Sequence, residues 1–104
     1  MTIQINTDKT ISGEQRSEDY FTSQIAEALQ RFESHISRIE VHLKDENGKK
    51  DGINDISCLI EARLEGRQPI AVTNQADSVD LALTGAIDKI KTAVGTIIGK
   101  MQKH

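Results

Sequence analysis

The sequence predicts an α+β fold in the order β-α-β-β-β-α, with a four-stranded mixed sheet and both helices packed on one face of it. Apolar residues alternate with polar ones in four short segments, whereas in two longer segments they recur every three or four residues. The chain has 104 residues, which is enough for one hydrophobic core and too short for two. We therefore expect a single domain over residues 1–104.

The first strand and the first helix are predicted near the N-terminus. Residues 2–6 alternate in polarity, as in a strand with one buried face. Ser12 and Gln15 have the spacing of a capping box, so we expect a helix that opens there and ends at about residues 33–34. Its apolar stripe consists of Phe21, Ile25, Ala28, Leu29, Phe32 and Ile36.

Three further strands follow. In the second strand the inward residues Ile39, Val41 and Leu43 alternate with Arg38, Glu40, His42 and Lys44. The charged residues 45–52 contain two glycines and are predicted to form a solvated hairpin loop. The third strand has Ile56, Cys58, Ile60, Ala62 and Leu64 on its inward face. Residues 66–68 are predicted to turn the chain, and Pro69 to open the fourth strand, whose Ile70 and Val72 point inward.

The last helix is predicted to run to about Met101. Asn74, Asp77 and Ser78 are competing candidates for its N-cap. The apolar stripe consists of Val79, Ala82, Leu83, Ala86, Ile90, Ala93, Val94, Ile97 and Met101. Gly85, Gly95 and Gly99 each cost this helix about 1 kcal/mol relative to Ala, which indicates close packing or fraying.

The connections between strands predict the sheet topology. A strand-helix-strand start gives a right-handed crossover, so the first two strands should be parallel. The two short connections that follow make the remaining pairs antiparallel.

The residue types show no constellation for catalysis or metal binding. The three histidines are scattered, with no second His or Cys at helical or hairpin spacing from any of them. Cys58 is the only cysteine, and its place among inward residues is typical of a small buried hydrophobe and not of a reactive thiol. The sequence contains no glycine-rich phosphate loop followed by a helix. We expect no enzyme, no metal and no cofactor.

Charge and hydropathy narrow the range of partners. The net charge of −3 argues against a generally adhesive nucleic-acid binder. From Lys89 onward, however, the chain is basic, and Lys89 and Lys100 share a helix face because they are three turns apart. Such an edge could contact phosphates, although lysines near a helix C-terminus also suit the helix dipole. With no apolar run of spanning length and no signal-like N-terminus, we expect a cytoplasmic protein that does not contact a membrane.

Three segments, in this order and at this spacing, resemble the ribosome hibernation-promoting factor and ribosome-associated inhibitor family, as a short and divergent member. They are Arg38–Glu46 (RIEVHLKDE), Cys58–Gly66 (CLIEARLEG) and Ala86–Ile90 (AIDKI). The resemblance implies a double-stranded-RNA-binding-like sheet and helix layer that lies in the mRNA and tRNA channel of the small ribosomal subunit. There it would block translation and protect idle ribosomes during stress or stationary phase.

The resemblance also implies which residues bind. Arg38 and Lys89 match motif positions expected to contact the rRNA backbone, and Lys91, Lys100 and Lys103 are added by their charge. The expected partners are the small ribosomal subunit and its rRNA, with no small-molecule substrate. The alternative is a protein-protein interaction module that has kept the fold and lost RNA binding.

Overall fold

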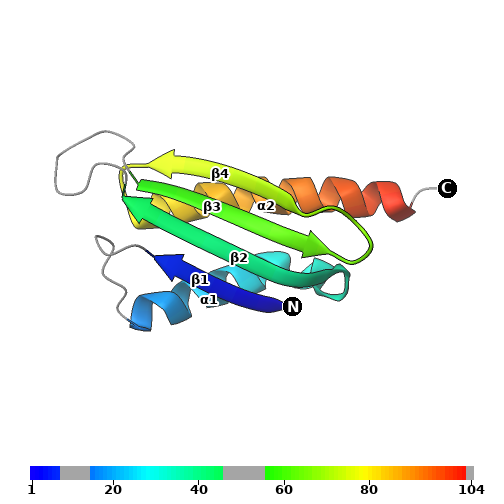
Figure 1. Cartoon of the computed structure of the whole chain (residues 1–104), viewed down its shortest axis with the longest axis horizontal. Coiled ribbons are helices and arrows are strands. Elements are labelled where there is room, and N and C mark those ends of the chain that lie inside the picture. Colours follow the sequence, from blue (N-terminus) through cyan, green and yellow to red (C-terminus); the bar gives the residue numbers. More distant parts are fainter. Residues whose placement is uncertain (8–14, 46–55, 103–104) are drawn as a thin grey trace.

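The computed structural model describes residues 1–7, 15–45 and 56–102. The elements in chain order are β1 (Thr2–Thr7), α1 (Gln15–Leu29), the 3-10 helix η1 (Gln30–His35), β2 (Ile36–Asp45), β3 (Ile56–Leu64), β4 (Ile70–Ala76) and α2 (Val79–Gln102). β1 pairs parallel with β2, whereas β2–β3 and β3–β4 are antiparallel, in the spatial order β1-β2-β3-β4. Both α-helices lie behind the sheet on the same side (Figure 1). The predicted α+β fold and its mixed sheet are confirmed.

The core lies between the sheet and the two helices. Ile39, Val41 and Ile60 of the sheet are fully buried against Leu83 and Ile90 of α2. Burying side chains of this size contributes about 1.5–3 kcal/mol each. A shift of one residue in register would turn this whole set toward solvent, so the one-sided burial fixes how the strands pair.

The end of the first helix differs from the prediction. The α-helix ends at Leu29, and Gln30–His35 tightens into the 3-10 helix η1, in which Phe32 is the buried residue. The expected α-helical end at residues 33–34 is therefore wrong. The other residues of this turn carry no apolar side chain that would hold a further α-helical turn against the core, and helix C-termini commonly tighten in this way. Ser12 of the predicted capping box lies outside the described residues.

The strand boundaries also shift slightly. β2 extends to Asp45, so only residues 46–52 of the predicted hairpin loop lie outside the described residues. Pro69 precedes β4 and is not its first residue, because proline has no N–H to donate to the hydrogen bonds of the sheet. In the turn before it, Gly66 has a φ of 73°, a conformation that favours glycine, and the Arg67 N–H donates to the Leu64 carbonyl at 3.3 Å.

Helix α2 begins at a serine cap. The Leu81 N–H donates to Ser78 Oγ at 3.2 Å, so Ser78 caps the helix in preference to the two other candidates. Ile87 and Ile98 are buried although they were absent from the predicted stripe, and Ile97 is only partly buried. The reason is that the buried residues recur at intervals of four, from Ala82 to Ile98 in one row and from Leu83 to Ile87 in the row beside it.

Candidate nucleic-acid interface

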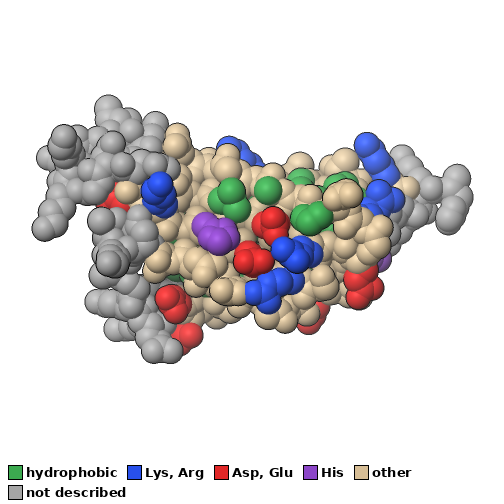
Figure 2. Space-filling view, in the orientation of Figure 1, with side chains coloured by type: hydrophobic (Ala, Val, Ile, Leu, Met, Phe, Trp, Pro, Cys, Tyr) green, Lys and Arg blue, Asp and Glu red, His purple; other side chains and the backbone are tan. Residues whose placement is uncertain are grey.

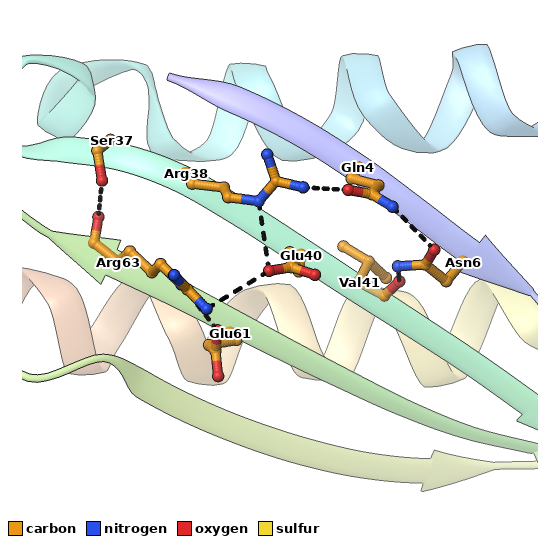
Figure 3. A network of polar contacts seen from close by, with 8 residues as sticks. All are labelled: Gln4, Asn6, Ser37, Arg38, Glu40, Val41, Glu61 and Arg63. Carbon is orange, nitrogen blue, oxygen red and sulfur yellow. Dashed lines mark hydrogen bonds and ion pairs between the residues drawn. The ribbon is translucent and has the colours of Figure 1, made fainter.

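The open face of the sheet carries a charge cluster made of Arg38, Glu40, Glu61 and Arg63. The β2–β3 register sets Arg38 opposite Arg63 and Glu40 opposite Glu61, so like charges face each other directly. Such pairs are destabilising unless they are compensated. Compensation comes from ion pairs within and between the strands: Arg38 Nε lies 3.3 Å from Glu40 Oε2, and Arg63 Nε lies 3.2 Å from Glu61 Oε1. Arg63 Nη2 also lies 3.9 Å from Glu40 Oε2 (Figure 3).

Strand β1 extends this network and holds Arg38 from its other side. Arg38 Nη2 donates to Gln4 Oε1, Gln4 Nε2 donates to Asn6 Oδ1 at 3.1 Å, and Asn6 Nδ2 donates to the Val41 carbonyl at 3.3 Å. Blue and red side chains lie side by side on this face (Figure 2). The charge cluster sums to zero, because two arginines face two glutamates. Arg38 is therefore positioned by several contacts, and its charge is largely compensated within the chain.

Lys89 and Lys100 lie on the side of α2 next to β4. Lys89 Nζ donates to the Thr73 carbonyl of β4 at 2.8 Å, a contact that leaves its charge uncompensated because the acceptor is neutral. Lys100 is exposed in the last turn of α2, about 16 Å farther along the axis and rotated from Lys89 by only about 20°. We call this pair the α2 lysine face.

The remaining predicted residues do not join this face. Lys91 is exposed and lines a groove of about 380 Å³ between α1 and α2, opposite Glu27 and Gln24. Lys103 lies outside the described residues. The four described candidates thus occupy three surfaces: the open sheet face with Arg38, the α2 lysine face, and the groove between the helices with Lys91.

Two residues near these surfaces were not predicted. Gln4 binds Arg38, and the only signal for it was its outward place in the alternation of the first strand. The Arg31 guanidinium carbon of η1 lies over the Phe32 ring, 5.1 Å from its centroid, and Arg31 lines a groove of larger volume, about 620 Å³, together with Lys91 and Asp88. No sequence signal distinguished Arg31 from any other exposed polar residue of the helix.

The described residues give little basis for other chemistry. Among residues 1–7, 15–45 and 56–102, no group of three or more His, Cys, Asp or Glu side chains could hold a metal ion. Burial removes water from the Cys58 thiol and raises its pKa to about 12, so the reactive thiolate does not form near neutral pH. No helix in the described part of the chain is both long and apolar enough to cross a bilayer.

The parallel β1–β2 pair, the two antiparallel pairs and the two helices on one sheet face form a fold that is found in other proteins of known structure. The crystal structure of the Protein Y N-terminal domain of Thermus thermophilus shares it, with a TM-score of 0.74 and 18% identity over 93% of this chain and 99% of that one. A ribosomal subunit interface protein from Coxiella burnetii matches with a TM-score of 0.68 and 17% identity, over 95% of this chain and 99% of its own. The resemblance predicted from the sequence is confirmed at the level of the fold.

Sequence comparison adds nothing to this likeness. No protein-family model matches the chain, and no curated protein matches it.

Proposed function

We propose that the chain is a ribosome-associated translation inhibitor of the hibernation type. It binds rRNA in the mRNA and tRNA channel of the small ribosomal subunit during stress or stationary phase, as a cytoplasmic single-domain binding protein and not as an enzyme. One observation carries the proposal: the fold agrees over 95% of this chain with a protein described as a ribosomal subunit interface protein, at a TM-score of 0.68.

The α2 lysine face is the main phosphate-contacting surface in this proposal. Contacts to an RNA backbone require positive charge at the right position and no reading of base edges. Lys89 and Lys100 meet this requirement because Lys89 is held by a neutral carbonyl and Lys100 is exposed. Arg38 contributes less, since Glu40 already pairs with it. Lys91 and Lys103 remain additional candidates.

Co-sedimentation with purified small subunits in sucrose gradients tests the proposal. The wild-type chain should bind at physiological salt and dissociate steeply as salt rises, because binding to phosphates releases counterions. The double change Lys89→Gln with Lys100→Gln should weaken binding and reduce the slope of log K against log salt by about one for each lost contact. Arg38→Gln should have a smaller effect than the double change.

The matched control is Arg63→Gln, which removes one positive charge from the open sheet face. Binding by this variant should match that of the wild type, and circular dichroism should show all variants folded. Wild-type protein that fails to co-sediment at physiological salt would contradict the proposal. So would an equal loss of binding in the Arg63→Gln control.

The neutral charge cluster favours a second candidate function, a protein-protein interaction module that docks through the open sheet face. This face also carries exposed His42 and half-buried Leu59, which lie opposite each other in the β2–β3 register. Under this alternative small subunits are not bound, and Leu59→Asp abolishes binding of the protein partner. The lysine changes on α2 would then leave that binding intact.

A further inference from the structure

Strand β4 forms one edge of the sheet and has the composition of a pairing strand. In the described part of the chain it pairs only with β3, so its outer side faces away from the sheet (Figure 1). All seven of its residues, Ile70–Ala76, are uncharged, and none of them is proline. The unpaired backbone groups of an exposed edge can pair with a strand of another chain, and proteins commonly prevent such pairing by placing a lysine at the edge.

The contact of Lys89 shows which backbone groups face outward. In an antiparallel strand the N–H and C=O of a residue point to the same side, and the side alternates along the strand. Because the Thr73 carbonyl is reached by Lys89 Nζ, at 2.8 Å, and not by β3, the outward groups belong to Thr73, Ala71 and Gln75. The side chains of these three residues are exposed on the open sheet face. The edge therefore offers a regular set of donors and acceptors, one of which Lys89 occupies.

The edge is also held in place by α2. Asn74 Nδ2 donates to the carbonyls of Ala82 and Leu81 at 3.2 and 3.4 Å, which ties β4 to the first turns of the helix. A strand fixed in this way loses little conformational freedom when another strand is added.

We propose that the β4 edge is a pairing surface for a second copy of this chain, with the two β4 strands antiparallel and centred on Thr73. We also propose that Lys89 prevents this pairing in the wild-type chain. In this register Thr73 pairs with Thr73 of the second copy, and Ala71 pairs with Gln75 on either side of it. Every cross-strand pair is uncharged, and paired threonines are favourable neighbours in a sheet.

Lys89 opposes this pairing in two ways. Its ammonium group occupies the carbonyl that the Thr73 N–H of the second copy would need. In the dimer, moreover, the two Lys89 side chains lie near the two-fold axis and repel each other. The wild-type chain is therefore monomeric, and neutralising Lys89 opens the edge.

Sedimentation velocity at submillimolar protein concentration tests the proposal. Lys89→Met should form a dimer at least about tenfold tighter than any wild-type association. The matched control is Lys91→Met, an exposed lysine on the opposite side of the same helix, which should remain monomeric. In the Lys89→Met dimer, the Thr73 amide should also become protected from hydrogen exchange.

Changes at Thr73 in the Lys89→Met background identify the surface. Thr73→Pro removes an outward N–H without breaking a β3–β4 hydrogen bond, so the dimer should dissociate, whereas Thr73→Val keeps the N–H and should keep the dimer. Thr73→Lys puts like charges opposite each other and provides a second block that does not depend on proline being tolerated. A Lys89→Met variant that stays monomeric overturns the proposal. A dimer that survives both Thr73→Pro and Thr73→Lys also overturns it, because another surface must then pair.

Discussion

Replacing Gly85 by alanine tests how β4 is fastened to α2. A Cβ atom at Gly85 would overlap Asn74 Nδ2 and lie 2.7 Å from Asn74 Cγ, so the amide group must move. The same nitrogen donates to the Ala82 carbonyl at 3.2 Å and to the Leu81 carbonyl at 3.4 Å. The added methyl group therefore breaks both hydrogen bonds. Gly85 is glycine because the Asn74 side chain occupies the space of its Cβ.

The magnitude follows from three contributions. The two hydrogen bonds, one of them long, together contribute about 1.5 kcal/mol. Displacing the Asn74 side chain costs about 1 kcal/mol. Alanine returns about 1 kcal/mol through its better helix propensity. Gly85→Ala should therefore lower the free energy of unfolding by about 1.5 kcal/mol, or the Tm by about 6–12 °C for a domain of this size.

A double-mutant cycle read by thermal and urea denaturation isolates the contact. In an Asn74→Ala background the new methyl group meets no amide, so Gly85→Ala should raise the free energy of unfolding by about 1 kcal/mol. The coupling between the two sites is then about 2.5 kcal/mol. Gly99→Ala is the matched control, since apart from its own helix backbone and chain neighbours no atom of the described residues lies within 4 Å of its Cβ position, and it should stabilise both backgrounds alike. Equal stabilisation by Gly85→Ala in both backgrounds would refute the reasoning.

Three further changes have expected outcomes. Ile60→Ala empties a fully buried position in the central strand β3 and should lower the free energy of unfolding by about 3–4 kcal/mol in urea, whereas a cost below about 1 kcal/mol would contradict the described core. Ser78→Ala removes the N-cap of α2 and should lower the free energy of unfolding by about 1 kcal/mol. A substitution at a position without a capping role should lower it by less. Burial raises the pKa of Cys58 from 9.0 to about 12, so the thiol ionises first in the unfolded chain and its contribution to stability is lost as pH rises above about 9. Urea midpoints should therefore fall more between about pH 8 and pH 10.5 in the wild type than in Cys58→Ala, and a thiol reagent should label Cys58 only after unfolding.

The strands could be predicted because their pattern and their burial have a single cause. Ile39, Val41 and Leu43 alternate with polar residues because one face of the sheet is covered, and the same alternation continues in β3. The α-helical end at Leu29 could not be predicted in this way. Phe32 satisfies the apolar period both in an α-helix and in the 3-10 helix that is found, so periodicity does not distinguish them.

The contacts of the candidate residues depend on distances that a linear pattern does not contain. The β2–β3 register decides that Arg38 faces Arg63 and Glu40 faces Glu61, and the alternation of polar and apolar residues does not by itself determine which residues face each other. Lys89 meets Thr73 only because α2 packs beside β4. The spacing in the sequence therefore placed Lys89 and Lys100 on one helix face, whereas only the structure shows that this face lies beside β4 and that Lys91 lines the groove between the helices.

Arg38 and Lys89, the two positions carried over by resemblance, differ in the charge of the groups that they contact within the chain. Each of the two residues makes a partly exposed contact that contributes only about 0.5–1 kcal/mol to stability. Either residue could therefore give up this contact and bind a phosphate instead. A phosphate that approaches Arg38 also meets the carboxylate of Glu40, and such a repulsion costs about 0.8 kcal/mol at 5 Å in water. One that approaches Lys89 meets a neutral carbonyl. Under the proposed function, electrostatics therefore assigns the larger share of phosphate binding to the α2 lysine face, and under the proposed β4 pairing Lys89 of this face is also the residue that prevents the dimer.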